Sequence, residues 1–294
     1  MTQTKTRSAT WPEPRIEPRS EIRRESRHET GTEPQDEPCA LAQPPLQRLR
    51  ARLHPESGAG GFSAIDGTVI FYVRVAALLT PGATVLDLGA GRGRAHLDDP
   101  VSFRRSLMDL RGRCARVIGV DPDPAVLDNP SLDEAMVMPS PEEVPLRDAS
   151  VDLILADHVL EHVADPQAFA RECGRLLRPG GWLCARTPNR WGLVAMASRA
   201  IPEGVHGAVL ARAQPHRRHE DVFPTCYRLN TRGALARAFP APGWGHHVHG
   251  WNSEPAYAGR SAIAWRAMQA LQAILPPAMD ANLHVFLRRG PPRA

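Results

Sequence analysis

The feature that most constrains this chain is an apolar run that ends in an acid and continues into closely spaced glycines. Residues 84–88 read TVLDL, and Gly89, Gly91 and Gly93 follow at every second position. A short apolar run bounded by turn residues predicts a buried strand of a parallel sheet. Because glycine has no Cβ atom, the following turn lets backbone approach a ligand closely. Open α/β sheets bind nucleotides at such a turn, beyond the carboxyl end of a strand.

The spacing of the glycines separates two classes of ligand. A dinucleotide-binding turn has the form G-x-G-x-x-G, and its third small residue packs the helix on the strand. Counted from Gly89, that position holds Arg94, which is large and charged, and the third glycine comes one residue earlier, at Gly93. Asp87 precedes the first glycine by two residues. Its carboxylate would repel a pyrophosphate but suits a cationic ligand.

The pattern Asp-x-Gly-x-Gly-x-Gly resembles the first motif of the class I S-adenosylmethionine-dependent methyltransferases, in particular their type 11-like members. The ligand of that family carries an ammonium group and a sulfonium. The resemblance covers roughly residues 66–190 and continues more weakly to the C-terminus. It implies a methyltransferase with S-adenosyl-L-methionine as its cofactor. The residues of this motif that are predicted to bind the cofactor are Asp87, Gly89, Ala90, Gly91 and Gly93.

Alternating strand and helix patterns predict the fold class. Short apolar strands are predicted at 117–120, 151–156 and 182–186, and helices at 101–111, 124–129 and 166–177. A further helix, capped by Asp66 and ending at Pro81-Gly82, precedes the first strand and helps to cover the site. This alternation predicts an α/β fold with a Rossmann-like, doubly wound, mainly parallel sheet. Two later strands, at 244–251 and 282–288, fit the antiparallel strands that end the family's fold.

An acid after the second strand is the second part of the predicted cofactor site. Asp121 can accept hydrogen bonds from both ribose hydroxyls, and Pro122 follows it in the turn. Asp121 lies further from the glycines than the ~20 residues usual in dinucleotide folds. The extra length falls in 94–100, where Asp98-Asp99-Pro100 predicts a delayed helix start. The competing interpretation makes Asp121-Pro122 a plain turn.

Two further segments match the family by resemblance. Residues 141–152 resemble its adenine-binding stretch, with Ser140 at the position where many members have an acid. Glu142 is therefore predicted to bind the cofactor, with a solvated surface turn as the alternative. Asp157 follows the third strand and is also predicted to bind the cofactor. Near it, His162 and then His158 are candidates for a base, because histidine titrates near neutral pH. The alternative is that His162 only packs near the cofactor.

Residues 178–181, Arg-Pro-Gly-Gly, predict a helix stop and chain reversal before the next strand.

We expect the acceptor to face the carboxyl end of the fourth strand. An insertion at about 190–240 is expected on the acceptor side. Asn189 follows the fourth strand and is predicted either to bind substrate or to satisfy turn amides. A basic, histidine-rich loop at 214–231 either clamps an anionic group or is a solvated loop. A metal site there lacks a diagnostic spacing, so we expect no metal. The candidate substrate-binding residues are Asn189, His216, Arg217 and Arg228.

Composition divides the chain into two parts. Residues 1–44 repeat Glu and Arg at four-residue spacing among prolines, with few large apolar residues. We expect a disordered low-complexity tail, with an interaction arm as the alternative. Residues 45–294 form the catalytic domain. The five cysteines are scattered and odd in number, which favours a reducing, cytoplasmic location without structural zinc. No apolar run approaches the ~18 residues of a membrane span, and the small net charge of +4 predicts no nucleic-acid partner.

The late region, residues 187–189 and 223–228, resembles bacterial members of the family that modify saccharides or small metabolites. This resemblance implies methyl transfer to an oxygen or nitrogen of a small-molecule or saccharide-type acceptor. The reaction needs little protein chemistry, because holding donor and acceptor in line supplies roughly 7–11 kcal/mol of the barrier. Two alternatives remain open at this point. One is a non-catalytic S-adenosylmethionine-binding regulator or scaffold. The other is an NAD-dependent oxidoreductase, which Arg94 and Asp87 disfavour.

Overall fold

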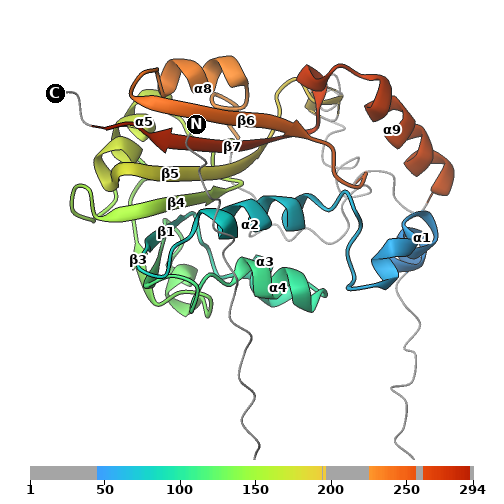
Figure 1. Cartoon of the computed structure of the whole chain (residues 1–294), viewed down its shortest axis with the longest axis horizontal. Helices are drawn as coiled ribbons and strands as arrows, with labels where there is room; N and C mark the ends of the chain where they lie inside the picture. The colour runs from blue at the N-terminus through green and yellow to red at the C-terminus, as the bar shows by residue number, and fades with distance from the viewer. Residues whose placement is uncertain (1–44, 194, 197–224, 256–260, 292–294) are drawn as a thin grey trace, which may run out of the picture. The chain divides into compact units, whose positions relative to one another are not determined.

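The computed structural model describes residues 45–193, 195–196, 225–255 and 261–291. These residues form a seven-stranded sheet with the order β3-β2-β1-β4-β5-β7-β6 (Figure 1). The first five strands in this order run parallel, whereas β7 pairs antiparallel with both β5 and β6. The predicted mainly parallel sheet with an antiparallel end is confirmed. The strands are β1 (Thr84–Leu88), β2 (Arg116–Asp121), β3 (Glu134–Val137), β4 (Val151–Asp157), β5 (Leu177–Pro188), β6 (Trp244–Trp251) and β7 (Asn282–Arg289).

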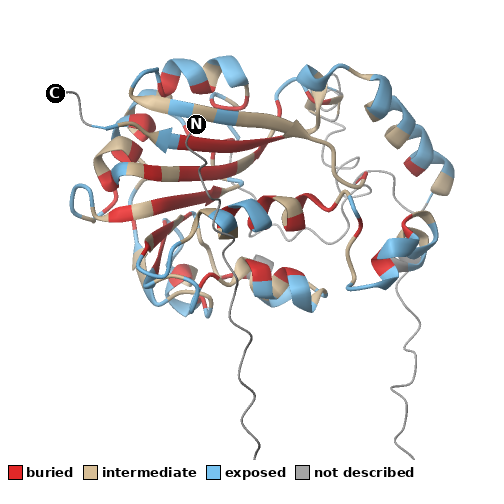
Figure 2. Ribbon diagram, in the orientation of Figure 1, coloured by how far each residue is buried: buried red, intermediate tan, exposed pale blue. Residues whose placement is uncertain are grey.

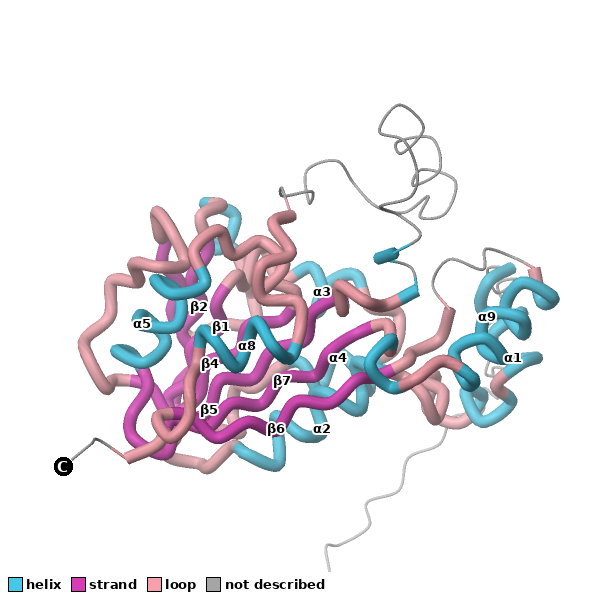
Figure 3. The backbone as a smooth tube through the Cα atoms, turned by 90° about the horizontal axis from the view of Figure 1, so that it is seen from above, coloured by secondary structure: helices cyan, strands magenta, loops and turns pink. Residues whose placement is uncertain are grey.

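Helices cover both faces of this sheet. Successive residues of a strand point to opposite faces, so the apolar strands contribute side chains to a core on each side. On one face, Leu86 and Ile154 belong to one hydrophobic core with Phe169 of α5 (Pro166–Leu176). Residues of α8 (Arg232–Ala238) belong to the same core. On the other face, Val85 joins Phe71 of α2 (Gly67–Leu78) and the core residues of α4 (Ser102–Met108). Figure 3 shows α2 and α5 on opposite sides of the strands. Buried residues run along the central strands in Figure 2, as expected for a sheet covered twice.

The helix before β1 forms where the sequence predicts it. The carboxylate of Asp66 accepts hydrogen bonds from the backbone N–H groups of Thr68 and Val69, 3.0 and 3.1 Å away, and so caps α2. Arg104 of α4 donates from Nη1 to the other oxygen of Asp66 at 2.7 Å. This buried contact joins the cap of α2 to α4 and fixes both helices against the same face of the sheet.

The helix after the glycines differs from the prediction of a delayed start. A short helix, α3 (Arg94–Asp98), begins directly after Gly93. The backbone N–H groups of His96 and Leu97 donate to the carbonyl oxygen of Gly93 at 3.0 and 2.9 Å. Gly93 has a φ of +75°, which allows the chain to leave the turn straight into a helix. Asp98 therefore ends α3, and Asp99-Pro100 lies between α3 and α4 instead of starting the first helix.

The predicted turn at residues 178–181 is also different. Helix α5 ends at Leu176, and β5 already begins at Leu177. The register with β4 passes from Val151↔Leu177 to Leu153↔Trp182, so the strand accommodates an irregularity where the turn was expected. Gly180 has a φ of +84° within it. The glycines bend the start of the strand; they do not stop the helix.

Several elements carried too weak a pattern to be predicted. The edge strand β3 is short and only partly buried, so it shows no hydrophobic alternation. By contrast, the helix predicted at 124–129 does form, as a 3-10 helix, η2 (Pro124–Asp128). Near the ends of the domain, His54 and Trp265 bring together two distant segments, with ring centroids 6.0 Å apart. The remaining unpredicted elements are α1 (Pro45–Leu53), η1 (Pro55–Gly58), α8, α9 (Ala262–Ile274) and η4 (Pro277–Met279). The predicted tail at 1–44 lies outside the described residues.

Candidate functional site

The glycine turn lies between the carboxyl ends of β1 and β2. Gly89, Gly91 and Gly93 have φ values of +75°, +51° and +75°, which only glycine adopts readily. The N–H groups of Gly89 and Ala90 both donate to the carbonyl oxygen of Val120 at the end of β2, at 2.8 and 3.2 Å. A Cβ atom built on Gly91 would have its nearest neighbour 3.9 Å away, so the backbone there stays open to a ligand.

Asn129, which no sequence motif indicated, supports this turn through hydrogen bonds. Asn129 is buried and donates from Nδ2 to the carbonyl oxygens of Ala90 and Gly91, both at 3.1 Å. Its Oδ1 accepts from the N–H and hydroxyl of Ser131 at 3.0 and 2.6 Å. A Cβ atom on Gly93 would lie 2.5 Å from this Oδ1. The third glycine is therefore required by the asparagine, which only tertiary structure brings to the turn.

Asp121 lies against the glycine turn, and its contact with the ribose stays a prediction. Its Oδ2 accepts from the N–H of Gly91 at 2.9 Å and its Oδ1 from the N–H of Asp123 at 2.8 Å. Burial raises the pKa of this carboxyl above its ordinary value, although these two backbone hydrogen bonds oppose the shift. A carboxylate has about four acceptor sites, so two lone pairs remain for hydroxyl donors. Pro122 continues the chain away from the site and is exposed.

Asp87 is a half-buried carboxyl near the end of β1. Burial raises its pKa to about 7, and the negative charges of Asp157 and Asp121 act in the same direction. Among residues whose side chains the structure describes, no ion pair joins Asp87 or Asp121 to a basic group. This edge of the sheet therefore has an excess of negative charge that a cation would neutralise.

Asp157, at the end of β4, has a basic partner of its own. Arg186 of β5 donates from Nε and Nη2 to its two oxygens at 2.9 and 2.8 Å, and Tyr72 of α2 donates to Oδ2 at 3.2 Å. Burial raises the pKa of Asp157, but the charges of Arg186 and His158 and the hydrogen bonds of Arg186 and Tyr72 together outweigh it, and the net pKa is lowered. Arg186 also reaches the hydroxyl of Thr68 at 2.8 Å. These contacts make Asp157 part of the wall of the site, and its predicted contact with the cofactor stays a prediction.

The two candidate histidines follow β4 and differ in their surroundings. His158 has 48% of its side chain exposed, and its Nδ1 lies 3.1 Å from Oε1 of the buried Glu161. His162 is half-buried, and its N–H donates to the carbonyl oxygen of Val159 at 2.9 Å. Val159 packs directly on the glycine turn, because a Cβ atom on Gly89 would lie 2.6 Å from its Cγ2. Both histidines therefore belong to the loop that borders the predicted cofactor site.

The predicted adenine segment passes close to Asp121. The N–H of Met138 donates to the carbonyl oxygen of Asp121 at 3.0 Å. Ser140 and Glu142 hydrogen-bond to each other through their side chains, and the N–H of Glu142 donates to Oγ of Ser140 at 3.0 Å. The structure thus brings both candidates for the adenine contact together, beside the predicted ribose ligand.

The predicted acceptor residues are only partly described, since His216 and Arg217 lie outside the described residues. Arg228 donates from Nη1 to the carbonyl oxygen of Ala164 at 2.7 Å. Asn189 donates from Nδ2 to the carbonyl oxygens of Ala278 and Asp280 at 2.9 and 2.8 Å, and its Oδ1 accepts from the N–H of Trp191. Of its two predicted roles, these contacts are those of a residue that satisfies turn amides.

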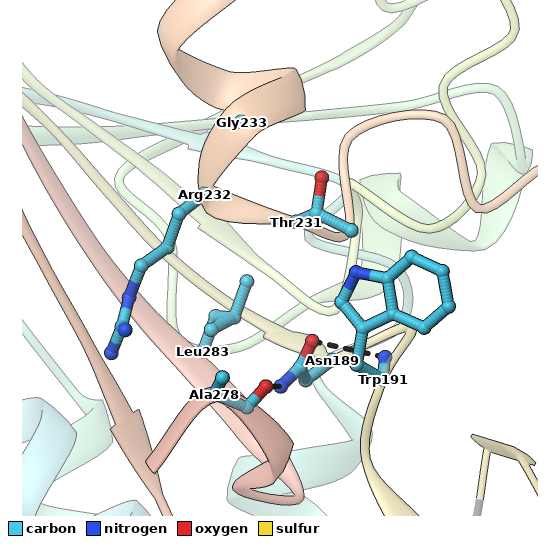
Figure 4. Close-up of a pocket in the computed structure, with 7 residues that line it drawn as sticks. All are labelled: Asn189, Trp191, Thr231, Arg232, Gly233, Ala278 and Leu283. Atoms are coloured by element: carbon cyan, nitrogen blue, oxygen red, sulfur yellow. Dashed lines mark hydrogen bonds between the residues drawn. The ribbon is translucent and has the colours of Figure 1, made fainter. Parts of the chain in front are cut away.

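A pocket of about 240 Å³ opens beside Asn189, beyond the end of β5 (Figure 4). Trp191 and Leu283 give it apolar walls, and the guanidinium of Arg232 lies on the opposite side from the indole of Trp191 (Figure 4). The pocket is thus suited to a small molecule with an apolar body. The lining residues are Asn189, Trp191, Thr231, Arg232, Gly233, Ala278 and Leu283.

Comparisons with known proteins identify the family. A family model described as a methyltransferase domain matches residues 86–185, which span the glycine turn and both histidines. A protein of Mycobacterium sp. strain JLS, named an uncharacterized methyltransferase, is 36% identical over 185 residues, which cover 56% of this chain and 69% of that protein. The chain belongs to the S-adenosylmethionine-dependent methyltransferases.

Two further matches extend the comparison of this methyltransferase. A probable S-adenosylmethionine-dependent methyltransferase of Mycolicibacterium smegmatis is 37% identical over 115 residues. That match covers 37% of this chain and 39% of the relative, so the chain spans about two fifths of the relative's length. A solved structure from Thermotoga maritima, titled a possible histamine N-methyltransferase, has 15% identity and a TM-score of 0.47. It covers 84% of this chain and 98% of that protein.

The residues present fit S-adenosylmethionine, the cofactor of this family. Asp87 and Asp121 provide carboxylates without a basic partner among the described side chains, which suits a ligand with an ammonium group and a sulfonium. Asp121 keeps free lone pairs for the ribose hydroxyls. A pyrophosphate would face the same negative charge without compensation, which is why the dinucleotide alternative fails on this geometry.

Proposed function

We propose that this methyltransferase transfers a methyl group from S-adenosylmethionine to an oxygen or nitrogen of a small-molecule or saccharide-type acceptor. The observation that carries the proposal is the pair of carboxylates, Asp87 and Asp121, beside a glycine turn that leaves backbone exposed. S-adenosylmethionine supplies a methyl group activated by the positive sulfonium. Asp121 would hold the ribose, and Asp87 would balance the positive charge of the ligand.

The acceptor side supports a small molecule. The pocket beyond β5 combines the apolar Leu283 and Trp191 with the basic Arg232. It lies after the carboxyl end of β5, at the same edge of the sheet as Asp87 and Asp121, because β1, β2, β4 and β5 run parallel. No helix among the described residues is long and apolar enough to cross a membrane.

Calorimetric titration tests the proposal. The purified chain is titrated separately with S-adenosylmethionine, with its demethylated product and with NAD. We expect the first two to bind at micromolar concentrations and NAD not to bind. Binding of NAD alone would overturn the proposal. Binding of S-adenosylmethionine without formation of the demethylated product over a panel of hydroxyl and amine acceptors would favour a non-catalytic role.

A further inference from the structure

His158 has an unusual backbone conformation at the edge of the site. It follows the last residue of β4 and has a φ of +61°, in the left-handed region that residues other than glycine rarely occupy. Its N–H donates to the carbonyl oxygen of Arg186 at 2.8 Å, which holds the residue in that conformation. Strain of this kind persists only where surrounding structure enforces it, most often at functional sites.

The buried carboxylate of Glu161 fixes the imidazole of His158. Glu161 is 5% exposed, and its Oε1 lies 3.1 Å from Nδ1 of His158. Its Oε2 accepts from the hydroxyl of Thr187 at 2.7 Å. Burial raises the pKa of Glu161, but the hydrogen bond and charge of His158 and the hydrogen bond of Thr187 outweigh it, and the net pKa is lowered. Glu161 is therefore ionised and can only accept hydrogen bonds.

A chain of hydrogen bonds then fixes where the proton of the imidazole lies. Asn230 faces the carbonyl oxygen of Pro188 at 2.8 Å, and a carbonyl only accepts, so the amide nitrogen of Asn230 must point this way. The same Nδ2 donates to Thr187 Oγ1 at 2.7 Å, so the hydroxyl of Thr187 is left to donate to Glu161. Glu161 in turn accepts from His158, and the proton of the neutral ring therefore lies on Nδ1. Nε2 then carries the lone pair, and Oδ1 of Asp157 lies 3.9 Å from it, beyond hydrogen-bond distance.

The orientation of the Asn230 amide agrees with this direction of the hydrogen bonds. Asn230 is fully buried, and its Oδ1 has no hydrogen-bond partner among the described residues. An unpaired buried acceptor costs free energy. The Nδ2 of Asn230 nevertheless donates to both Thr187 and the carbonyl oxygen of Pro188. The free energy of these hydrogen bonds therefore outweighs the cost of the unpaired oxygen.

We propose that His158 is the general base for a hydroxyl acceptor, and that Glu161, Thr187 and Asn230 are positioning residues that keep its Nε2 unprotonated. This inference rests on the proposed function. An alcohol or phenol carries its proton at neutral pH and is a weak nucleophile until a base removes it, an effect worth about 10²–10⁴-fold in rate. The neighbouring Val159 packs on Gly89, which sets the loop of His158 beside the predicted cofactor site.

The transfer step balances with these residues alone. A lone pair of the acceptor oxygen forms the new bond to the methyl carbon. The hydroxyl proton passes to Nε2 of His158, giving an imidazolium that Glu161 stabilises. The electron pair of the broken carbon–sulfur bond stays on sulfur, which becomes a neutral thioether. An amine that is already unprotonated does not need this base, so the arrangement favours a hydroxyl acceptor.

Nitrogen-15 spectroscopy of the histidine rings tests the proposal without requiring the acceptor. The full chain is labelled, and the signals of His158 are assigned by their loss in His158→Gln. We expect the neutral ring to be mainly the Nδ1–H form. Glu161→Gln should reduce the ratio of Nδ1–H to Nε2–H severalfold, and Thr187→Val should reduce it less. Glu143→Gln, an exposed carboxylate of the same domain, serves as the matched control and should leave the ratio unchanged.

The same samples separate this inference from the proposed function. Calorimetry with S-adenosylmethionine should give the same affinity, within about twofold, for the wild type and Glu161→Gln. An Nε2–H ring in the wild type, or an unchanged ring in Glu161→Gln, would overturn the inference even if S-adenosylmethionine binds. Failure of S-adenosylmethionine to bind the wild type would instead overturn the proposed function.

Discussion

Two regions of the same sheet edge are built in opposite ways. The cofactor side, at the ends of β1 and β2, is joined largely through backbone groups, such as the N–H of Gly91, which donates to Asp121. Its three glycines lie at every second position of one short segment. The acceptor side, at the ends of β4 and β5, consists of side chains from distant parts of the chain, of which His158, Thr187 and Asn230 are examples. A motif of the first kind appears in the sequence as a fixed spacing. An assembly of the second kind has no spacing to detect.

The difference extends to charge. Asp87 and Asp121 have no basic partner among the described side chains, whereas Asp157 and Glu161 each face a basic or potentially basic group. The cofactor side is therefore prepared for a positive ligand, and its carboxylates remain destabilised until that ligand binds. The acceptor side is internally satisfied and so can hold one side chain in a defined orientation. Four predictions test this contrast, from the largest expected effect to the smallest.

Arg186→Met should have the largest effect, because it leaves the buried carboxylate of Asp157 without its cation at the boundary of the two regions. We expect the free energy of unfolding to fall by roughly 3–5 kcal/mol in urea denaturation. The matched control is Arg178→Met, which removes an ion pair with Asp152 on the exposed part of the same two strands. That change should cost at most about 1 kcal/mol. Equal losses in the two variants would contradict the prediction.

Asp121→Ala should weaken binding of S-adenosylmethionine by roughly 30–150-fold, equivalent to about 2–3 kcal/mol, because it removes the predicted ribose contacts and the anchor of Gly91. Calorimetry measures the affinity, and circular dichroism confirms that the variant is folded. Asp128→Ala, an exposed neighbour in η2, is the control and should bind as the wild type does. An affinity within twofold of the wild type for Asp121→Ala would remove the ribose assignment.

Gly89→Ala tests the contact between the two regions. Its new Cβ would lie 2.6 Å from Cγ2 of Val159, at a φ of +75°. Gly112 has a φ of +73° and nothing within 4 Å of the corresponding position, so Gly112→Ala carries the backbone strain without the clash. We expect Gly89→Ala to lower the free energy of unfolding by about 1–3 kcal/mol more than the control does. The double variant Gly89→Ala/Val159→Ala should recover part of that difference; no recovery would mean that the clash is not the cause.

Asp87→Asn should stabilise the unliganded protein while weakening S-adenosylmethionine binding. The pKa of Asp87 in the folded protein, about 7, lies above its ordinary value of 3.8. Ionisation of this group therefore costs no stability below pH 4 and costs progressively more as the pH rises towards 7. The variant should have a melting temperature a few degrees higher at pH 7, with a difference that shrinks towards pH 4. A lower melting temperature at pH 7 would contradict the raised pKa.

Most of the sheet could be predicted, because its strands are apolar runs with clear limits. β1 and β6 have the predicted bounds, and β2, β4 and β7 extend them by one or two residues. The cap at Asp66 was also predictable, since an aspartate before an apolar periodic segment has a local effect. The helix directly after Gly93 was missed because Asp98-Asp99-Pro100 is a stronger local start signal than the residues before it.

The residues of the candidate site also fall into two groups, those that the sequence indicates and those that only the tertiary structure brings together. The sequence determined the glycine turn, Asp87 and Asp121, because these residues act through backbone geometry and charge that their neighbours in the chain already define. It also pointed to His162 and, after it, to His158, whereas the structure places the buried carboxylate of Glu161 beside His158. Only the tertiary structure decided that Asn129 supports the turn and that Glu161, Thr187 and Asn230 order His158. Those contacts depend on side chains that meet when β4, β5 and the segment before α8 pack together, and no local pattern in the sequence encodes such a meeting.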